Sequence, residues 1–245
     1  MDLNADLGEG FGVYAFGEDE SLLGVITSAN IACGFHAGDP QVMDRTVKMA
    51  KEYGVFIGAH PGYPDREGFG RRHIPYSCQE IANQMIYQMG ALSAFAVRHG
   101  TTLHHVKLHG ALYNVAAVNE DMAKCVTDAI AAYDPRLVLY APSGSRLASV
   151  AKTEGLTVWQ EFFADRSYEW DGSLTPRNIE GSVMDAVDAV VERVLFAISK
   201  GQVTTRTGEV ISLHFDTICI HGDHSGAATL AKHLREAFKR SGIMK

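Results

Sequence analysis

Short apolar runs alternate along the chain with longer amphipathic segments. We predict strands at residues 2–7, 28–33, 55–59, 104–108, 136–141, 157–161 and 217–221. Sequence signals that are typical of helices occur between the predicted strands. Asp39 followed by Pro40 is typical of a helix N-terminus, Ser77 and Glu80 have the spacing of a capping box, and apolar residues recur at helical period from Ile81 onward. Seven strand–helix units predict a parallel sheet with right-handed crossovers, either closed as a barrel or open and doubly wound.

The rest of the chain offers no boundary between domains. Residues 205–212 fit a small hairpin that turns at Thr207-Gly208, and no linker, charge block or low-complexity tract interrupts the alternation. With 46% hydrophobic residues the chain has ample material for a packed core. We therefore expect one domain over residues 1–245.

Charge and cysteine content narrow the possible functions. The net charge of −7 argues against nucleic acid as a partner, because such binding depends on phosphate neutralisation by Lys and Arg. We expect no membrane span, since no run of 18 apolar residues occurs, and no secretory signal, since the first residues lack its basic and apolar parts. The four cysteines, Cys33, Cys78, Cys125 and Cys219, are scattered without a C-x-x-C pair, so we expect thiols in a reducing cytoplasm.

The first predicted strand has an unusual polar face. Asp2, Asn4 and Asp6 alternate with apolar residues, whereas bulky branched side chains normally fill a barrel interior. Residues four apart on a strand are separated by about 13 Å, so Asp2 and Asp6 do not share a metal ion. Asp6 is nearer the C-terminal end of the strand and is the better candidate for function.

Reactive side chains also follow the other predicted strands at their C-terminal ends, where parallel α/β folds place their active sites. Lys107 and His109 are two apart and face the same side, and Lys107 is expected to have a carboxylate nearby because lysine is seldom buried unpaired. The residues selected in this way are Asp6, His36, His60, Lys107, His109, Glu161, Asp165, Arg166, His221 and Asp223. We predict that they meet around one pocket.

Common nucleotide and nucleophile motifs are not found. The glycine-rich stretch Gly8–Gly12 lacks the lysine and hydroxyl of a P-loop, and no G-x-S-x-G elbow occurs. If the protein uses ATP, it does so without a Walker motif, or a partner chain holds the nucleotide.

Several longer stretches resemble the LamB/YcsF family. They are "DLNADLGEGFG" (2–12), "NIACGFHAGDP" (30–40), "GAHPGYPD" (58–65), "KLHGALYN" (107–114), "EFFADRSY" (161–168) and "HGD" (221–223). They cover nearly the whole chain, in order. Leu108 departs from the proline that is more usual there, which changes local stiffness but no functional side chain. The resemblance implies an irregular seven-stranded (β/α) TIM-like barrel of the glycoside hydrolase/deacetylase type, and so favours closure.

The resemblance also implies an activity. Characterised bacterial members of the family are the A component of the ATP-dependent 5-oxoprolinase, which converts 5-oxo-L-proline, ATP and water to L-glutamate, ADP and phosphate. It therefore implies ATP as co-substrate, Mg²⁺ with the ATP, subunits B and C as partners and a small lactam as substrate; a homo-oligomer is also possible. The lactam is a resonance-stabilised amide, and phosphorylating its oxygen would make its carbon open to attack by water.

Such a reaction suggests roles for the candidate residues. Arg166 is expected to bind the substrate carboxylate, and Lys107 is expected to stabilise the negative charge that develops during the reaction. The general base would be Asp6, Glu161, His60 or His109. The expected substrate-binding residues are Asn4, His36, Tyr113, Asp165, Arg166, His221 and Asp223.

Two other functions fit the same residues. One is a metal-dependent, deacetylase-like hydrolase acting on a small amide or N-acetylated sugar, with Asp6, His36 and His60 as the metal ligands. Their spacing is not a recognised metal signature. The other is a non-catalytic subunit that binds the lactam.

Overall fold

Seven parallel strands form a closed barrel in the computed structural model, which describes residues 1–14, 17–220 and 226–243. In the order of their pairing the strands are β1 (Asp2–Leu7), β2 (Ser28–Ala32), β3 (Phe56–His60), β4 (His105–Lys107), β5 (Val138–Pro142), β6 (Val158–Phe163) and β9 (Thr217–Ile220). The barrel closes because β9 pairs with both β1 and β6, with Asn4 opposite Cys219 and Phe163 opposite the same cysteine. The predicted strand positions agree with these bounds to within two residues, and closure excludes the open sheet.

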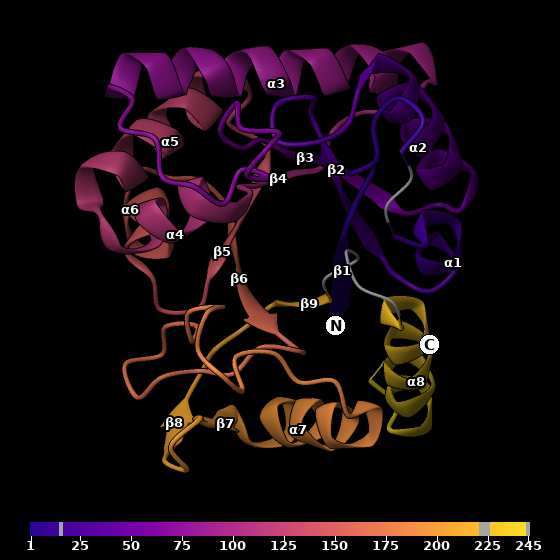
Figure 1. Cartoon of the computed structure of the whole chain (residues 1–245), viewed down its shortest axis with the longest axis vertical. Helices are drawn as coiled ribbons and strands as arrows, with labels where there is room; N and C mark the ends of the chain where they lie inside the picture. The colour runs from indigo at the N-terminus through magenta and orange to yellow at the C-terminus, as the bar shows by residue number, and fades with distance from the viewer. Residues whose placement is uncertain (15–16, 221–225, 244–245) are drawn as a thin grey trace.

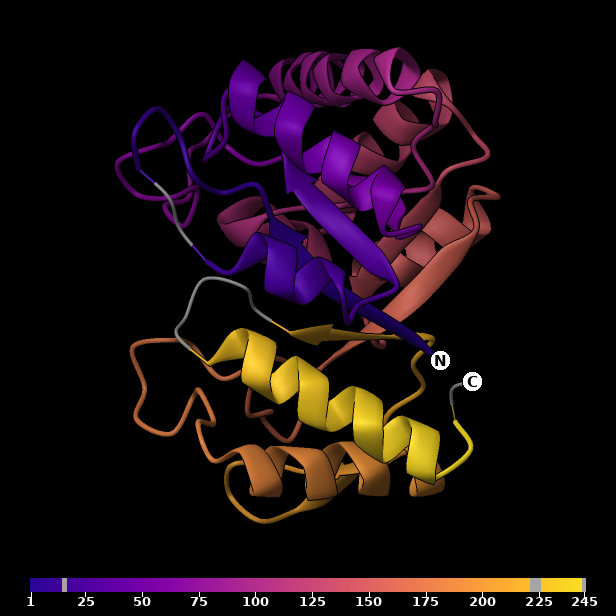
Figure 2. The same cartoon turned by 90° about the vertical axis from the view of Figure 1, so that its right-hand side faces the viewer.

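Helices surround the barrel on its outer side (Figures 1 and 2). They are α1 (Asp19–Leu23), α2 (Pro40–Glu52), α3 (Cys78–Arg98), α4 (Gly110–Val118), α5 (Glu120–Tyr133), α6 (Arg146–Thr153), α7 (Val187–Lys200) and α8 (Ala227–Arg240). The α3 helix packs on α5, α5 on α6, and α7 on α8. No helix among the described residues is long and apolar enough to cross a membrane.

The predicted helix starts are confirmed. The Asp39 side chain accepts hydrogen bonds from the backbone N–H groups of Gln41 and Val42 at the start of α2, and Ser77 and Glu80 form the capping box of α3. The hairpin begins earlier than predicted: its strands are β7 (Gln202–Thr204) and β8 (Val210–Ser212). Residues 205–209 instead form the connecting loop, because the backbone N–H of Thr205 donates to the carbonyl of Glu209 and closes it.

One expectation about the cysteines is wrong. Cys78, the first residue of α3, is joined by a disulfide to Cys125 of α5. The two helices pack against each other, which brings the Cα atoms to 5.6 Å although 47 residues separate the cysteines in sequence. Cys33 and Cys219 are free and buried.

The polar face of β1 lies inside the barrel and forms a hydrogen-bonded floor. The Ser28 hydroxyl donates to Asp2 at 2.7 Å. One layer higher, the Asn30 amide donates to the Asn4 side-chain oxygen at 2.8 Å, and the His105 Nε2–H donates to the Asn30 oxygen at the same distance. Buried polar groups are stable when they are satisfied in this way, so the floor holds the residues above it in fixed positions.

Candidate active site

A cavity of about 1220 Å³ lies at the C-terminal ends of the strands. Side chains of predicted site residues reach it from β1, β3, β4, α4 and β6, together with the loop after β6. The predicted residues that line the cavity are Asp6, His60, Lys107, His109, Tyr113, Glu161 and Arg166. The expectation that side chains distant in sequence share one pocket is therefore met for these seven.

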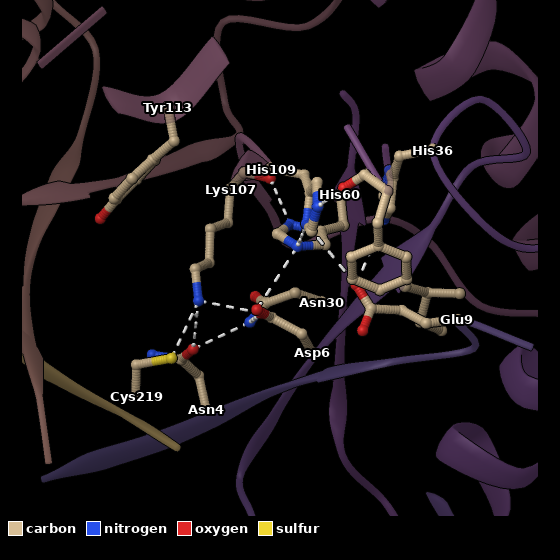
Figure 3. Close-up of polar contacts among 12 residues, drawn as sticks. Asn4, Asp6, Glu9, Asn30, His36, His60, Lys107, His109, Tyr113 and Cys219 are labelled. Atoms are coloured by element: carbon tan, nitrogen blue, oxygen red, sulfur yellow. Dashed lines mark hydrogen bonds and ion pairs between the residues drawn. The ribbon is translucent and has the colours of Figure 1, made fainter. Parts of the chain in front are cut away.

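Lys107 lies at the centre of the buried charges (Figure 3). Its Nζ atom is 2.9 Å from Asp6 Oδ1 and 3.1 Å from Glu161 Oε1. It also donates to the sulfur of Cys219 at 3.0 Å and lies 3.3 Å from the Asn4 oxygen. The strand carries a buried lysine because acids from β1 and β6 compensate its charge, as expected for ionised groups in a protein interior.

The lysine is an ammonium ion in this setting. Burial by itself lowers the pKa of Lys107, but the surrounding acids, Asp6 foremost, outweigh it and raise the pKa well above its usual value. Burial also raises the pKa of the Cys219 thiol well above its usual value. The sulfur therefore contacts the ammonium as a neutral thiol.

The two oxygens of Glu161 have different partners. The Tyr113 hydroxyl donates to Oε2 at 2.5 Å, and burial, followed by Glu161, raises the pKa of Tyr113 well above its usual value, which keeps it a donor. Oε1 lies near the Lys107 ammonium but accepts no hydrogen bond from the described residues, because the geometry there is that of an ion pair only. A buried carboxylate oxygen with an open lone pair can take a proton from a ligand or a water molecule.

Three histidines form a second cluster beside these charges. The His36 and His109 rings stack with centroids 3.7 Å apart, and His109 Nδ1 is 2.9 Å from His60 Nε2. Glu9 Oε1 lies 3.2 Å from His36 Nε2, and His60 Nε2 is 3.5 Å from Asp6 Oδ2. Burial, followed by the neighbouring rings, lowers the pKa of both His36 and His109 well below its usual value, so both rings are neutral.

The other predicted residues differ in how they relate to the cavity. Asn4 is under Lys107, in the barrel interior. Arg166 lines the cavity, but its guanidinium also donates to the backbone carbonyls of Ser182 and Thr175. Asp165 is buried and is not among the lining residues. His221 and Asp223 lie outside the described residues. The roles given to these residues stay predictions.

Several residues at the site escaped the sequence-based selection. Glu9 lies two residues after the end of β1 and lines the cavity, so the rule that selected the other strand ends would also have found it. Asn30, which donates to Asp6 at 2.9 Å, faces the barrel interior from β2. Arg71 and Arg177 reach the cavity from loops, and no sequence signal indicates that.

The arrangement defines a class of protein: a closed (β/α) barrel with an acid–lysine–acid group and an imidazole cluster at the C-terminal mouth. A model of the LamB/YcsF family matches residues 1–245, and the chain belongs to this family. The predicted family and fold class are thereby confirmed.

Named relatives are similar over almost their full length. Proteins named as the A component of 5-oxoprolinase, from Heliobacterium modesticaldum and Pyrococcus abyssi, are each 49% identical to this chain over 243 residues, which is 99% of this chain and 96% and 95% of theirs. The solved structure of a lactam utilization protein from Thermus thermophilus superimposes with a TM-score of 0.93 at 41% identity, covering 98% of this chain and 96% of that one.

Proposed function

We propose that this chain is the lactam-cleaving subunit of an ATP-dependent 5-oxoprolinase, which converts 5-oxo-L-proline to L-glutamate while ATP becomes ADP and phosphate. The names of its relatives support this assignment. The observation that carries it is the position of the Lys107 ammonium between Asp6 and Glu161, on the wall of a cavity that can hold a small ring.

The proposed roles follow from these contacts. ATP phosphorylates the ring oxygen, water adds to the ring carbon, and the C–N bond breaks as the ring nitrogen leaves with the proton taken from that water; a second water then releases phosphate from the acyl phosphate. Lys107 stabilises the negative charge on the ring oxygen while water adds. Glu161 takes the proton of that water, because its Oε1 has an open lone pair. Asp6 already accepts from Asn30 and Lys107, so it positions the ammonium.

The cavity is larger than a five-membered lactam requires, since pockets for drug-sized ligands are about 300–1,000 Å³. Arg71, Arg146 and Arg177 are among its lining residues, and guanidinium groups suit carboxylates and phosphates. We infer that the extra space admits the phosphate donor or a segment of subunits B and C. Because this chain has no Walker motif, those partner subunits hold the ATP and its Mg²⁺. A reaction that uses ATP and forms glutamate takes place in the cytoplasm.

Reconstitution tests the proposal. The chain is mixed with subunits B and C, and glutamate formed from 5-oxo-L-proline is measured with and without ATP and with and without this chain. We expect glutamate only when all components are present. Glutamate formation that does not depend on this chain would refute the assignment.

A matched pair of variants separates a catalytic from a merely binding subunit. Glu161→Gln removes the proposed proton acceptor but keeps the shape of the side chain, whereas Glu192→Gln changes an exposed acid on α7. We expect the first to lower turnover at least about 100-fold, within the range of general-base catalysis, and the second to have no effect. A Glu161→Gln complex with normal turnover would favour the non-catalytic, lactam-binding alternative.

A further inference from the structure

His60 and His109 at the cavity wall each have one ring nitrogen that faces the other ring. His60 Nδ1 lies 2.8 Å from the backbone carbonyl of Lys107, and His109 Nε2 lies 2.8 Å from the carbonyl of Phe69. A carbonyl only accepts, so both of these nitrogens carry the ring proton. His60 Nε2 and His109 Nδ1 are the ring nitrogens that remain, and they lie 2.9 Å apart. Two ring nitrogens this close either share one proton or lie against one cation.

Two further donors face the same point. Glu9 Oε1 is 3.5 Å from His109 Nδ1 and 3.2 Å from His36 Nε2. One ligand atom from each of Glu9, His36, His60 and His109 lies within 4.8 Å of the other three, and all four residues are buried (Figure 3). His36 Nδ1 has no hydrogen-bond partner among the described residues, and Nε2 faces Glu9 Oε1, so an ion bound there would take the place of the proton between Nε2 and Glu9.

We propose that Glu9, His36, His60 and His109 bind one divalent transition-metal ion, with zinc the best fit. Three imidazoles and one carboxylate form a donor set that suits zinc and its neighbours better than magnesium or calcium. Ligand atoms about 2.1 Å from an ion are about 3.0 Å apart at a right angle and about 3.4 Å apart in a tetrahedron. The separations of 2.9, 3.2 and 3.5 Å lie at this spacing. The His36 ring lies parallel to the His109 ring, so His36 must turn for its Nε2 to point at the same ion.

The surroundings of the cluster support a metal over a shared proton. Metal-binding histidines almost always donate their second N–H to a carbonyl or carboxylate, which fixes the ring, and His60 and His109 both do so. A proton between these two rings would satisfy two nitrogens, and a second proton on His36 Nε2 would satisfy Glu9. One divalent ion would replace both protons and bind all four groups.

Glycines allow the tight packing of the cluster. A Cβ atom at Gly70 would lie 2.8 Å from the His36 side chain and 2.9 Å from the His109 ring, and its φ of +62° also favours glycine. Glu9, His60 and His109 also line the cavity, so the bound ion would lie at the cavity wall.

Metal binding by the isolated chain tests this inference and requires no turnover, so it is independent of the lactam assignment. The purified chain is freed of metal with a chelator and dialysed against Zn²⁺ or Co²⁺. We expect one ion per chain by elemental analysis, and visible absorption bands of imidazole-bound Co²⁺. Glu9→Gln and His36→Gln should each weaken binding at least about 10-fold, whereas His233→Gln, an exposed histidine on α8, should bind like the wild type.

Two results would overturn the inference. One is a chain that takes up no ion with excess Zn²⁺ or Co²⁺. The other is equal binding by wild type, Glu9→Gln and His36→Gln. The near-isosteric Glu9→Gln variant keeps the test valid if His36→Gln does not fold, and thermal unfolding of each variant without metal identifies that case. In either negative result the His60–His109 pair shares a proton instead.

Discussion

The Nζ atom of Lys107 is 2.9 Å from Asp6 Oδ1 and 3.1 Å from Glu161 Oε1, so one buried ammonium ion separates two buried carboxylates. The three residues lie on strands that are far apart in the sequence, and the charge of each is stabilised by its oppositely charged neighbours. A change at any of the three residues therefore affects both the stability of the barrel and the chemistry at its mouth.

Replacing Lys107 by Met should lower the free energy of unfolding by about 3–5 kcal/mol, the usual cost of leaving a buried charge without its partner. It should also abolish glutamate formation by the reconstituted complex. Urea unfolding and turnover at saturating substrate measure the two effects. Lys152→Met, at an exposed position on α6, is the control, and unchanged turnover of the Lys107 variant would remove this lysine from the chemistry.

Tyr113→Phe removes a single hydrogen bond from the site. The hydroxyl donates to Glu161 Oε2 at 2.5 Å, and a hydrogen bond to a charged group contributes about 1.5–3 kcal/mol. If turnover requires this bond, kcat should fall about 10- to 150-fold while the fold is kept, since the ring stays packed near Phe163. Tyr87→Phe, an exposed tyrosine on α3, should leave kcat unchanged. Equal kcat values for both variants would show that Tyr113 does not support Glu161 in the reaction.

The sequence predicted those parts of the site that depend on strand ends. His60 and Lys107 end buried strands, Glu161 lies near the end of another, and parallel strands bring their C-terminal ends to one edge. Glu9 follows the same rule, but it was considered only as part of the glycine-rich stretch Gly8–Gly12, which was rejected as a P-loop. Arg71 could not be predicted, because a loop far from any strand end carries it to the cavity.

The hydrogen-bond partners of side chains inside the barrel could not be predicted from the sequence either. Asn30 contacts Asn4, Asp6 and His105, which belong to different strands, and only the register of a closed sheet brings them together. Periodicity indicated a polar inner face on β1 but not its partners. The disulfide was missed for the same reason, because it depends on the packing of α3 against α5.

Gly58→Ala should disrupt the barrel floor. A Cβ atom at Gly58 would overlap the His105 ring, so the ring would have to leave both Asn30 and its stacking contact with Tyr140. We expect a loss of about 1–3 kcal/mol in unfolding free energy, as for other overpacked cores. Gly90→Ala, within α3 with no atom near its new Cβ, should instead stabilise by up to about 1 kcal/mol. Urea unfolding of both variants measures the contrast, and a Gly58 variant as stable as the wild type would contradict the role of His105.

Thiol counting tests the disulfide. Burial raises the pKa of Cys33 to about 12, and Cys219 is also buried, so neither should react with a thiol reagent in the native protein. We expect two reactive thiols in denaturant without reductant and four after reduction, because Cys78 and Cys125 are joined. Four reactive thiols in denaturant before reduction would show that the bond is not formed in the purified protein.

An ion pair in the loop before α3 should make stability depend on pH. The Asp65 carboxylate accepts from Arg72 Nε at 3.0 Å, and this bond, followed in the same direction by the Gly68 N–H, lowers the pKa of Asp65 to about 2 against the opposing effect of burial. The same loop supplies the Phe69 carbonyl that holds His109. Since the folded pKa is below the unfolded value of about 3.9, the stabilisation is complete above about pH 4 and is lost as the pH falls toward 2.

Asp65→Asn should therefore have a lower urea midpoint than the wild type at pH 6, and the difference should shrink steadily between pH 4 and the lowest pH at which the protein folds. Glu67→Gln is the matched control in the same loop. The Glu67 carboxylate is 3.8 Å from Arg72 and its side chain is 93% exposed, so solvent screens this ion pair. The urea midpoint of Glu67→Gln should therefore equal that of the wild type at every pH. A difference for Asp65→Asn that stays constant as the pH falls would mean that the carboxylate acts through its shape and not through its charge.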